Sequence, residues 1–417
     1  MSLKNMEQNS VRYRPRRKNN ETRMRCETER LTNNAEPRRK KSTRRRRIYD
    51  LLAHVPTFLV RFLRLLSFVM FLLPAFVVFV WYYVIAGDRV AVYYGKKNKA
   101  RDPIFSRHIL DIYGSRSPSP SGDEKKPVVI FVTGGAWIIG YRMWGCLLGR
   151  ALAPFGVIVV IPDYTNFPKA NIEGMVEDVD RSIQWTFDNI HKYGGDQSRV
   201  VLVGQSAGAH IGGVVVALKA LDHIRRDYKG SRNLETTYSP QQLRGFISTS
   251  SPSNLVTMRP VFHNHGLSES VQRSIFGGTA VDNEVFEKWS PFHIIEKCQT
   301  KCEGNLGDFF PKICIVHGTA DKTVPVSEAY AFEKLLKRLG VQHTSRIYEG
   351  WSHTDPILEA PMRGNHKYHR DVLDLVRQWT GEDRTKVFPT NFDENHPHLG
   401  PICPSLLVQA ARKCNPF

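Results

Sequence analysis

Short apolar runs alternate with segments of helix length along most of the chain after residue 125. The runs are continuous and rich in β-branched residues, which is typical of strands buried on both faces of a parallel sheet. They lie at residues 128–132, 157–161, 200–203, 243–247 and 313–316. Strand and helix in turn predict an α/β fold, with a mostly parallel central sheet flanked by helices.

Two stretches interrupt this repeating pattern. Residues 222–242 are charged and polar, and residues 253–306 are rich in His, Phe and Trp. Because long irregular connections in a compact domain are usually lids or disordered segments, we predict that both are cap insertions over a site. Aromatic residues in the second would either line a pocket for an acyl or alkyl group or form the core of the cap. They are Phe262, Phe276, Trp289 and Phe292.

An apolar run at residues 65–87 precedes this pattern and holds 23 residues without a charge. It is long enough to span a bilayer, and it ends in an aromatic cluster of the kind found at membrane interfaces. The alternative is a hydrophobic hairpin buried in protein. Residues 48–64 carry several charges and favour an interfacial helix. We therefore predict a membrane-associated segment at 48–88, with a transmembrane part at about 65–87.

Basic residues are concentrated before this segment, since residues 1–50 hold 17 Lys and Arg against 6 Asp and Glu in a chain of net charge +19. So polar a stretch cannot bury enough surface to offset its ordering entropy, and we predict a disordered basic tail at 1–47. A solvated tail, a signal for anionic lipids or topology, and a nucleic-acid arm are the alternatives. The adjoining apolar run favours the lipid or topology signal over specific nucleic-acid binding.

The orientation of the segment in the membrane stays open. The positive-inside rule places the tail in the cytosol, so one span would send the rest of the chain into a lumen. The single N-x-S/T sequon, at Asn20, lies in the tail, whereas a lumenal domain often carries some. Pro74 could also turn the run into a hairpin. The remaining chain divides into a catalytic domain at 89–390 and a C-terminal extension at 391–417.

A serine between two glycines follows the apolar run at 200–203, in the sequence Gly204-Gln205-Ser206-Ala207-Gly208. This pattern is that of the nucleophile elbow of an α/β-hydrolase, where a strand turns at once into a helix and exposes the hydroxyl at the sheet edge. Glycines are required beside the serine because side chains would clash in so sharp a turn. The sequence predicts Ser206 as a nucleophile, and an ordinary glycine turn is the alternative.

A serine nucleophile needs a histidine base that is held by a carboxylate, and in this fold the three occur in the order Ser, Asp or Glu, His. Asp321 follows the run at 313–316, and His353 follows a further predicted strand at 344–348. Both therefore come after strand ends and in the required order. We predict Ser206, Asp321 and His353 as the catalytic triad.

Acyl transfer also needs N–H groups directed at the developing oxyanion. A glycine-rich loop follows the run at 128–132, and its Gly134, Gly135 and Ala136 are predicted donors together with Ala207, beside the substrate-binding candidate Gln205. This chemistry requires no metal and no organic cofactor. The seven cysteines form no disulfide framework, and Cys298 and Cys302 lack the further ligands of a zinc site.

Five segments together resemble the plant isoprenylcysteine α-carbonyl methylesterases over residues 81–379. They are Val132-Thr133-Gly134-Gly135-Ala136-Trp137-Ile138-Ile139-Gly140-Tyr141, Asp163-Tyr164, Asn166-Phe167-Pro168, Gly204-Gln205-Ser206-Ala207-Gly208-Ala209-His210 and His353-Thr354-Asp355-Pro356. The resemblance implies hydrolysis of the methyl ester on a farnesyl- or geranylgeranyl-cysteine, at endoplasmic reticulum and Golgi membranes. Thr165 replaces an arginine of the family pattern, which implies a paralogue of altered substrate preference.

Other activities compete with this interpretation. Another carboxylesterase or an arylformamidase would use a similar glycine-rich loop. A non-catalytic receptor built on a hydrolase fold would typically lack one member of the triad, so the complete set argues against it. The expected partners are therefore a prenylated-cysteine methyl ester substrate and membrane lipids, while the oligomeric state stays open.

Overall fold

The computed structural model describes part of a helical stretch between residues 59 and 84, and then residues 89–95, 107–115, 125–224, 236–278, 283–302, 304–381, 388 and 397–414. Residues 62–417 form one compact unit, and of residues 1–61 only Leu59 is described. The predicted basic tail at 1–47 therefore lies outside the described residues.

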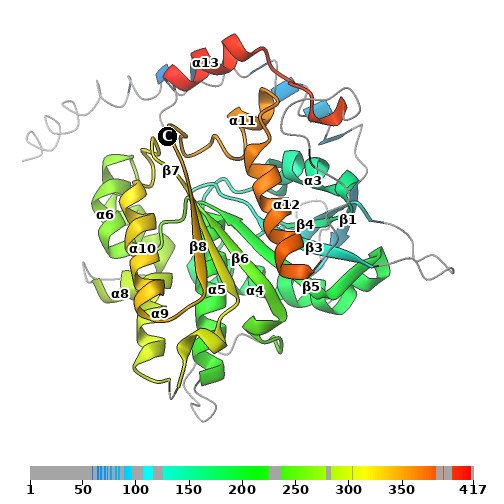
Figure 1. Ribbon diagram of the computed structural model, residues 1–417. Helices are drawn as coiled ribbons and strands as arrows, with labels where there is room; N and C mark the ends of the chain where they lie inside the picture. The colour runs from blue at the N-terminus through cyan, green and yellow to red at the C-terminus, as the bar shows by residue number, and fades with distance from the viewer. Residues whose placement is uncertain are drawn as a thin grey trace, which may run out of the picture. The chain divides into compact units, whose positions relative to one another are not determined.

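The described residues form a central sheet of eight strands in the order β1-β2-β4-β3-β5-β6-β7-β8 (Figure 1). The antiparallel pairs are β1 with β2 and β2 with β4, and the other neighbours are parallel. This arrangement confirms the predicted α/β fold. The strands are β1 Arg89–Tyr93, β2 Ile109–Tyr113, β3 Lys126–Val132, β4 Ile158–Pro162, β5 Gly195–Gln205, β6 Leu243–Thr249, β7 Lys312–Gly318 and β8 His343–Tyr348.

Apart from Val157, which precedes β4, the predicted apolar runs lie in strands of this sheet, because β-branched residues pack well on a surface covered from both sides. The run at 128–132 is completely buried. Strand β1 was not predicted from the sequence. It is a short edge strand whose side chains are partly exposed, so it lacks the continuous apolar signal of the inner strands.

Helices cover both faces of the sheet (Figure 1). Side chains such as Val128 and Ile130 pack with α4, α5, α9 and α10 on one face, whereas Val129 and Phe131 pack with α3 and α12 on the other. Two hydrophobic cores therefore enclose the inner strands. The helices named here are α3 Cys146–Leu152, α4 Ile172–Asn189, α5 Ala207–Ile224, α9 Pro291–Gln299, α10 Val326–Arg338 and α12 Lys367–Thr380. Short 3₁₀ helices are η2 Arg142–Gly145, η3 Ala153–Phe155, η4 Ile190–Tyr193, η5 Pro240–Gln242, η6 Leu306–Phe309 and η7 Pro397–Leu399.

The two predicted cap insertions lie at different edges of the sheet. The second, at 253–306, leaves the carboxyl end of β6 and holds α6 Leu255–Asn264, α7 Glu269–Phe276, α8 Asn283–Lys288 and α9. The first, at 222–242, connects the far end of α5 to the start of β6, so its described residues lie at the opposite edge from Ser206. A connection that enters the amino end of a parallel strand is remote from the carboxyl edge, so these described residues do not cover Ser206, and residues 225–235 lie outside the described part of the chain.

The C-terminal extension packs against the catalytic domain. Helix α13 Ser405–Cys414 buries Val408 and Ala411 in a cluster with Met362 of α11 Glu359–Met362. Backbone N–H groups of Ile402 and Cys403 donate to the carbonyl oxygen of Met362 at 2.9 and 3.0 Å.

Within the described part of the chain, no helix combines the length and the apolar character needed to cross a membrane. The predicted span at 65–87 is described only in part, and those positions are helical up to Val84.

Candidate active site

Ser206 lies between the end of β5 and the start of α5, with a φ of 55°. A non-glycine residue seldom adopts this left-handed conformation, which costs roughly 1–3 kcal/mol. Its N–H donates to the carbonyl oxygen of Thr249 on β6 at 2.9 Å. A Cβ on Gly208 would come within 2.2 Å of the Val132 carbonyl oxygen, so the elbow helix approaches β3 too closely for any side chain at that position.

The structure brings the three predicted triad residues together at the carboxyl edge of the sheet. His353, in the loop after β8, has its Nε2 2.8 Å from the Oγ of Ser206. Its Nδ1 lies 2.8 Å from Oδ2 of Asp321, which follows β7. All three side chains are buried. An Nδ1–H donated to the carboxylate leaves Nε2 free to accept the serine proton.

Asp321 is held as a carboxylate by its surroundings. Its Oδ1 accepts hydrogen bonds from the N–H groups of Thr323 and Val324 at 2.9 and 2.8 Å. Burial raises its pKa, but the charge and hydrogen bond of His353 and the nearby His317 lower it by more, so the pKa lies below the ordinary value. His317, 3.4 Å from Oδ2, was not predicted from the sequence, and burial lowers its pKa.

The predicted oxyanion loop lies directly against the nucleophile. A Cβ on Gly134 would be 2.9 Å from the Cβ of Ser206. Gly135 has a φ of 131°, and Ala136 has a φ of 48°. Among the described residues no protein acceptor binds the N–H of Gly135 or Ala136. Ala207, as the first residue of α5, also has an N–H without an intrahelical partner. These N–H groups are available to an oxyanion.

A buried histidine fixes the far side of this loop. Trp137, with a φ of 63°, donates its Nε1–H to Nδ1 of His210 at 3.3 Å. Nε2 of His210 lies 2.7 Å from the carbonyl oxygen of Trp289, to which it donates. Burial lowers the pKa of His210 to about 4, so the imidazole is neutral and can donate on one side and accept on the other. The oxyanion loop, the elbow helix and the cap are thereby linked.

Aromatic residues of the cap pack against the same indole. The rings of Phe262 and Phe276 stand edge-on to Trp137, with centroids 5.4 and 5.2 Å away. Both phenylalanines and Trp289 are buried, and Phe292 is partly buried. The first three therefore form cap core, which was one of the two alternatives expected for them.

Gln205 has a different surrounding from the one predicted for a substrate-binding residue. Its Nε2 donates to the backbone carbonyl oxygen of His353 at 3.2 Å, and its side chain is buried. The contact joins the nucleophile elbow to the histidine loop. Gln205 therefore contributes to the position of the two loops in this structure.

Ion pairs hold the other end of the oxyanion loop. The carbonyl oxygen of Gly140 accepts hydrogen bonds from Asn166 at 2.7 Å and from Arg107. Asp163 pairs with Arg142 at 3.0 Å. Burial raises the pKa of Asp163 to about 6, although Arg107 and Arg142 lower it. This network was not predicted, because its members come from three separate segments of the chain, around Arg107, Gly140 and Asp163.

Thr165, the departure from the family pattern, lies at the edge of this network. Its backbone N–H donates to Oδ2 of Asp178 on α4 at 2.9 Å. The other oxygen of that carboxylate pairs with His108 and Arg181 at 2.9 and 2.5 Å. The carboxylate beside Thr165 is therefore held by Arg181 of the same helix and by the imidazole of His108.

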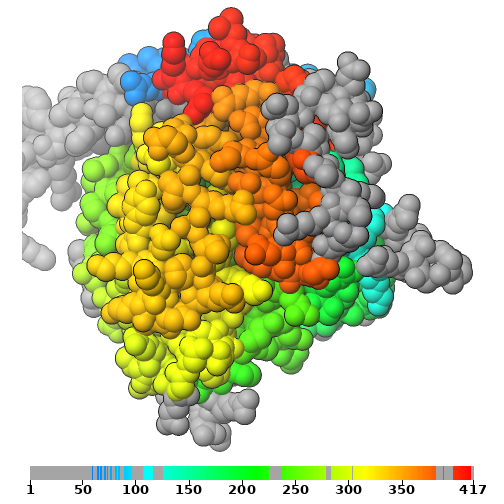
Figure 2. Space-filling view, in the orientation of Figure 1, coloured from blue at the N-terminus to red at the C-terminus, as the bar shows by residue number. Residues whose placement is uncertain are grey.

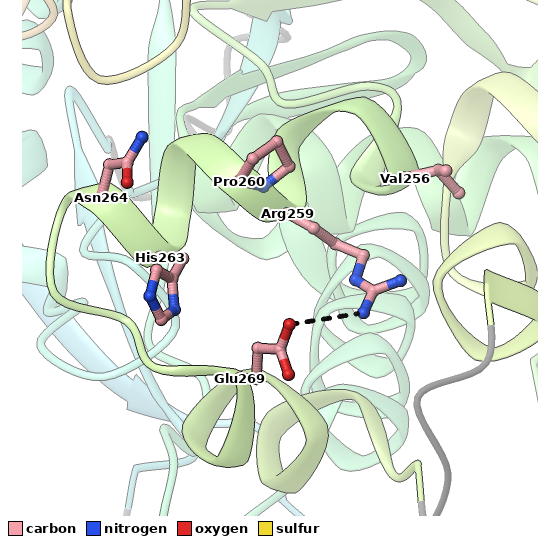
Figure 3. A pocket seen from close by; sticks show the side chains of 6 residues that line it. All are labelled: Val256, Arg259, Pro260, His263, Asn264 and Glu269. Carbon is pink, nitrogen blue, oxygen red and sulfur yellow. Dashed lines mark ion pairs between the residues drawn. The ribbon is translucent and has the colours of Figure 1, made fainter. Parts of the chain in front are cut away.

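A hollow of ≈ 320 Å³ lies on the cap between α6 and the start of α7 (Figure 3). Arg259 and Glu269 face each other across it with 4.0 Å between their charged atoms. No triad residue lines this hollow, so it is separate from the catalytic centre. The lining residues are Val256, Arg259, Pro260, His263, Asn264 and Glu269.

Comparison with known proteins agrees with the geometry. The BD-FAE family model matches residues 110–336. The chain is 34% identical to an isoprenylcysteine alpha-carbonyl methylesterase of Arabidopsis thaliana over 86% of this chain and 77% of that protein. It is 35% identical to a probable isoprenylcysteine alpha-carbonyl methylesterase of Oryza sativa subsp. japonica, over the same shares of the two chains.

A solved structure supports the fold independently. An inhibited esterase B from Lactobacillus rhamnosis superposes with a TM-score of 0.55 at 16% identity, covering 70% of this chain and 88% of that one. The fold is therefore that of the α/β-hydrolases. Taken with its relatives, the chain belongs to the isoprenylcysteine α-carbonyl methylesterase family and is a carboxylic ester hydrolase.

Proposed function

We propose that this protein hydrolyses the methyl ester of a cysteine that bears a farnesyl or geranylgeranyl group. The substrates would be prenylated proteins or their breakdown products. The substrate class is inferred from the related methylesterases of Arabidopsis thaliana and Oryza sativa. One observation supports the reaction type. The imidazole of His353 lies 2.8 Å from the hydroxyl oxygen of Ser206 and 2.8 Å from a carboxylate oxygen of Asp321. The same geometry speaks against a non-catalytic receptor, which would typically lack part of it.

The mechanism is a two-step acyl transfer. His353 takes the proton of Ser206 at Nε2 while the serine oxygen attacks the cysteinyl carbonyl carbon, and the N–H groups of Gly135, Ala136 and Ala207 bind the oxyanion. The imidazolium then protonates the methoxy group, which leaves as methanol. Water, deprotonated by His353, releases the acyl-enzyme in the second step. Asp321 stabilises the imidazolium in both steps, and no metal or cofactor takes part.

We further propose that the segment around 65–87 associates with membrane lipids of the endoplasmic reticulum and Golgi. Phe71 and Phe76 pack into the domain, and the hydroxyl of Tyr83 donates to buried Asp111 at 2.8 Å. Apolar side chains at other positions of the same helical stretch are exposed and could contact lipid. A lipid contact would suit the proposed substrate, because an isoprenoid chain partitions to the bilayer surface. The exposed side chains are Leu66, Met70, Leu73, Val77, Val80, Trp81 and Val84.

A substrate panel tests the proposed activity. The full chain, purified in detergent, is incubated with farnesylcysteine methyl ester, its geranylgeranyl analogue, p-nitrophenyl butyrate and N-formylkynurenine, and product release is measured. We expect the highest kcat/KM with a prenylcysteine ester, and loss of activity in Ser206→Ala but not in the exposed-site control Ser270→Ala. Preference for N-formylkynurenine would instead indicate an arylformamidase, and preference for the butyrate a different carboxylesterase.

Vesicle flotation tests the proposed lipid contact. We expect the full chain to float with vesicles that contain phosphatidylserine, and the double substitution Leu66→Asp with Leu73→Asp to reduce the floated fraction. The matched control places the aspartates at the exposed cap positions Asn264 and Ser270. Equal flotation of the two double variants would contradict the proposed contact.

A further inference from the structure

The C-terminal helix lies next to the loop that carries His353. Helix α13 sits against α11 at one end of the molecule, where Figures 1 and 2 show it in red beside the orange segment. Its apolar face buries Val408 and Ala411. The next residue, Arg412, points its side chain toward the histidine loop.

The guanidinium of Arg412 contacts this loop on both sides of the catalytic histidine. Its Nη2 donates to the carbonyl oxygen of Gly350 at 2.8 Å and to Oδ2 of Asp355 at 2.7 Å. These two residues lie three positions before and two positions after His353. One side chain from the C-terminal helix therefore fixes the path of the loop at its entry and its exit.

Asp355 is the internal support of the loop. Its carboxylate is fully buried, and Oδ2 also accepts the N–H of Ser352 at 2.8 Å. The other cation near this carboxylate, Arg363, lies 3.9 Å away. A buried carboxylate requires hydrogen bonds and a counter-charge, so loss of Arg412 would leave Asp355 under-compensated and would favour rearrangement of the loop.

A second carboxyl group contacts the residues on either side of His353. Oε1 of Glu359, in α11, accepts the hydroxyl of Thr354 at 2.9 Å and lies 3.5 Å from that of Ser352. The histidine loop is thus supported by α11 and by α13 together. A loop held at so many points is of the kind that enzymes use to keep a general base in register with its nucleophile.

We propose that Arg412 is a positioning residue for His353, so that the C-terminal helix is required for catalysis as well as for packing. This inference rests on the proposed serine-esterase mechanism. It predicts that loss of Arg412 lowers the rate of proton transfer from Ser206 and has little effect on ground-state binding of the ester. A purely structural role would lower the thermal stability and leave the rate of the folded enzyme unchanged.

The test compares Arg412→Ala, Arg412→Lys and the control Lys413→Ala, which removes an exposed cation from the same turn. The full chain is assayed with p-nitrophenyl acetate well below each variant's Tm, and labelling of Ser206 by a fluorophosphonate is timed. A 1 Å displacement of a catalytic group can cost about 100-fold, so we expect kcat and the labelling rate to fall about 10- to 100-fold in Arg412→Ala, with KM within about twofold. Arg412→Lys keeps the charge but loses the planar guanidinium with its several N–H donors. Its kcat should lie between those of the alanine variant and the wild type.

A kcat within twofold of wild type in folded Arg412→Ala would overturn the proposal, and so would a loss equal to that in Lys413→Ala. A double-mutant cycle with Asp355→Asn adds a check, because residues that act through one contact have non-additive effects. Additive losses would also contradict it. Hydrolysis of p-nitrophenyl acetate without hydrolysis of farnesylcysteine methyl ester would refute the proposed substrate, while the result for Arg412 would stand.

Discussion

The indole N–H of Trp137 donates to Nδ1 of His210, and this bond joins the oxyanion loop to the elbow helix that begins directly after Ser206. Trp137 has a left-handed backbone conformation that an aromatic residue adopts only when its surroundings hold it there. His210 supplies that restraint. Its other ring nitrogen binds the carbonyl oxygen of Trp289, which connects the loop to the cap. The position of the oxyanion donors therefore depends on a histidine that has no part in proton transfer.

Replacing His210 should affect both stability and rate. In His210→Ala, the N–H of Trp137 and the carbonyl oxygen of Trp289 lose their partners, and a cavity remains in the core. We expect the free energy of unfolding to fall by about 2–4 kcal/mol and kcat to fall at least about tenfold. Urea unfolding and ester hydrolysis measure the two effects. The control His263→Ala, at an exposed position on α6, should change neither, and an unaltered kcat in folded His210→Ala would refute the link to the oxyanion loop.

A side chain at Gly135 should disrupt the oxyanion loop. Its Cβ would lie 2.3 Å from the backbone nitrogen of Gly140, in a conformation with a φ of 131°. Gly135→Ala must therefore displace the backbone that carries the donors, and we expect kcat to fall about 100-fold or more, as it does when an oxyanion donor is removed. Steady-state kinetics with p-nitrophenyl acetate checks this expectation.

The matched control for this substitution is Gly277→Ala. Gly277 also has a positive φ, of 81°, but a Cβ there meets no atom within 4 Å. Its replacement should cost about 1–2 kcal/mol of stability from backbone strain alone, with full activity. Equal kinetic effects of the two variants would show that strain, and not displacement of the loop, determines the rate.

The triad could be predicted from the sequence because each member follows a predicted strand. Strand ends of a parallel sheet meet at one edge, so Asp321 and His353 were expected near Ser206 from their order alone. The partners of His210 and Arg412 gave no such signal. Trp289 lies 79 residues from His210 and Asp355 lies 57 residues from Arg412, so only the folded chain brings each pair together.

Two parts of the domain were harder to predict from the sequence. The insertion at 222–242 was expected to cover the site because it is long and polar, but α5 ends at the other edge of the sheet, so the described residues of the insertion lie there. Residues 391–417 were predicted only as a C-terminal extension. The contact of α13 with α11 was not predicted, because a periodic pattern can indicate an apolar helix face but not the element against which that face packs.

Asp321→Asn should keep the fold and lose most of the activity. An asparagine can still accept the N–H groups of Thr323 and Val324 through its amide oxygen, but its NH₂ group would face Nδ1 of His353 and favour the wrong tautomer. We expect kcat to fall by about 10⁴, with a circular dichroism spectrum like that of the wild type. Asp308→Asn, an exposed change of the same chemistry, should leave kcat unaltered. A loss of less than tenfold in Asp321→Asn would identify a different carboxylate as the partner of His353.

Glu359 should make stability depend on pH. Burial, and then the charge of Asp355, raise its pKa to about 7 from an ordinary value of 4.5. Between these two pH values the folded protein holds a proton that the unfolded chain releases, so the free energy of unfolding falls as the pH rises through this window. The full shift corresponds to roughly 3 kcal/mol for this completely buried group.

Glu359→Gln places a permanently neutral side chain of the same shape at this position. Other titrating groups are common to both proteins, so the difference in free energy of unfolding between variant and wild type isolates Glu359. We expect this difference to grow in favour of the variant from pH 4.5 to pH 8, as measured by urea unfolding at several pH values. The exposed control Glu349→Gln should give a difference that is flat over this range. A flat difference for Glu359→Gln as well would mean that Glu359 is already ionised at pH 5, and that Arg412 compensates its charge together with that of Asp355.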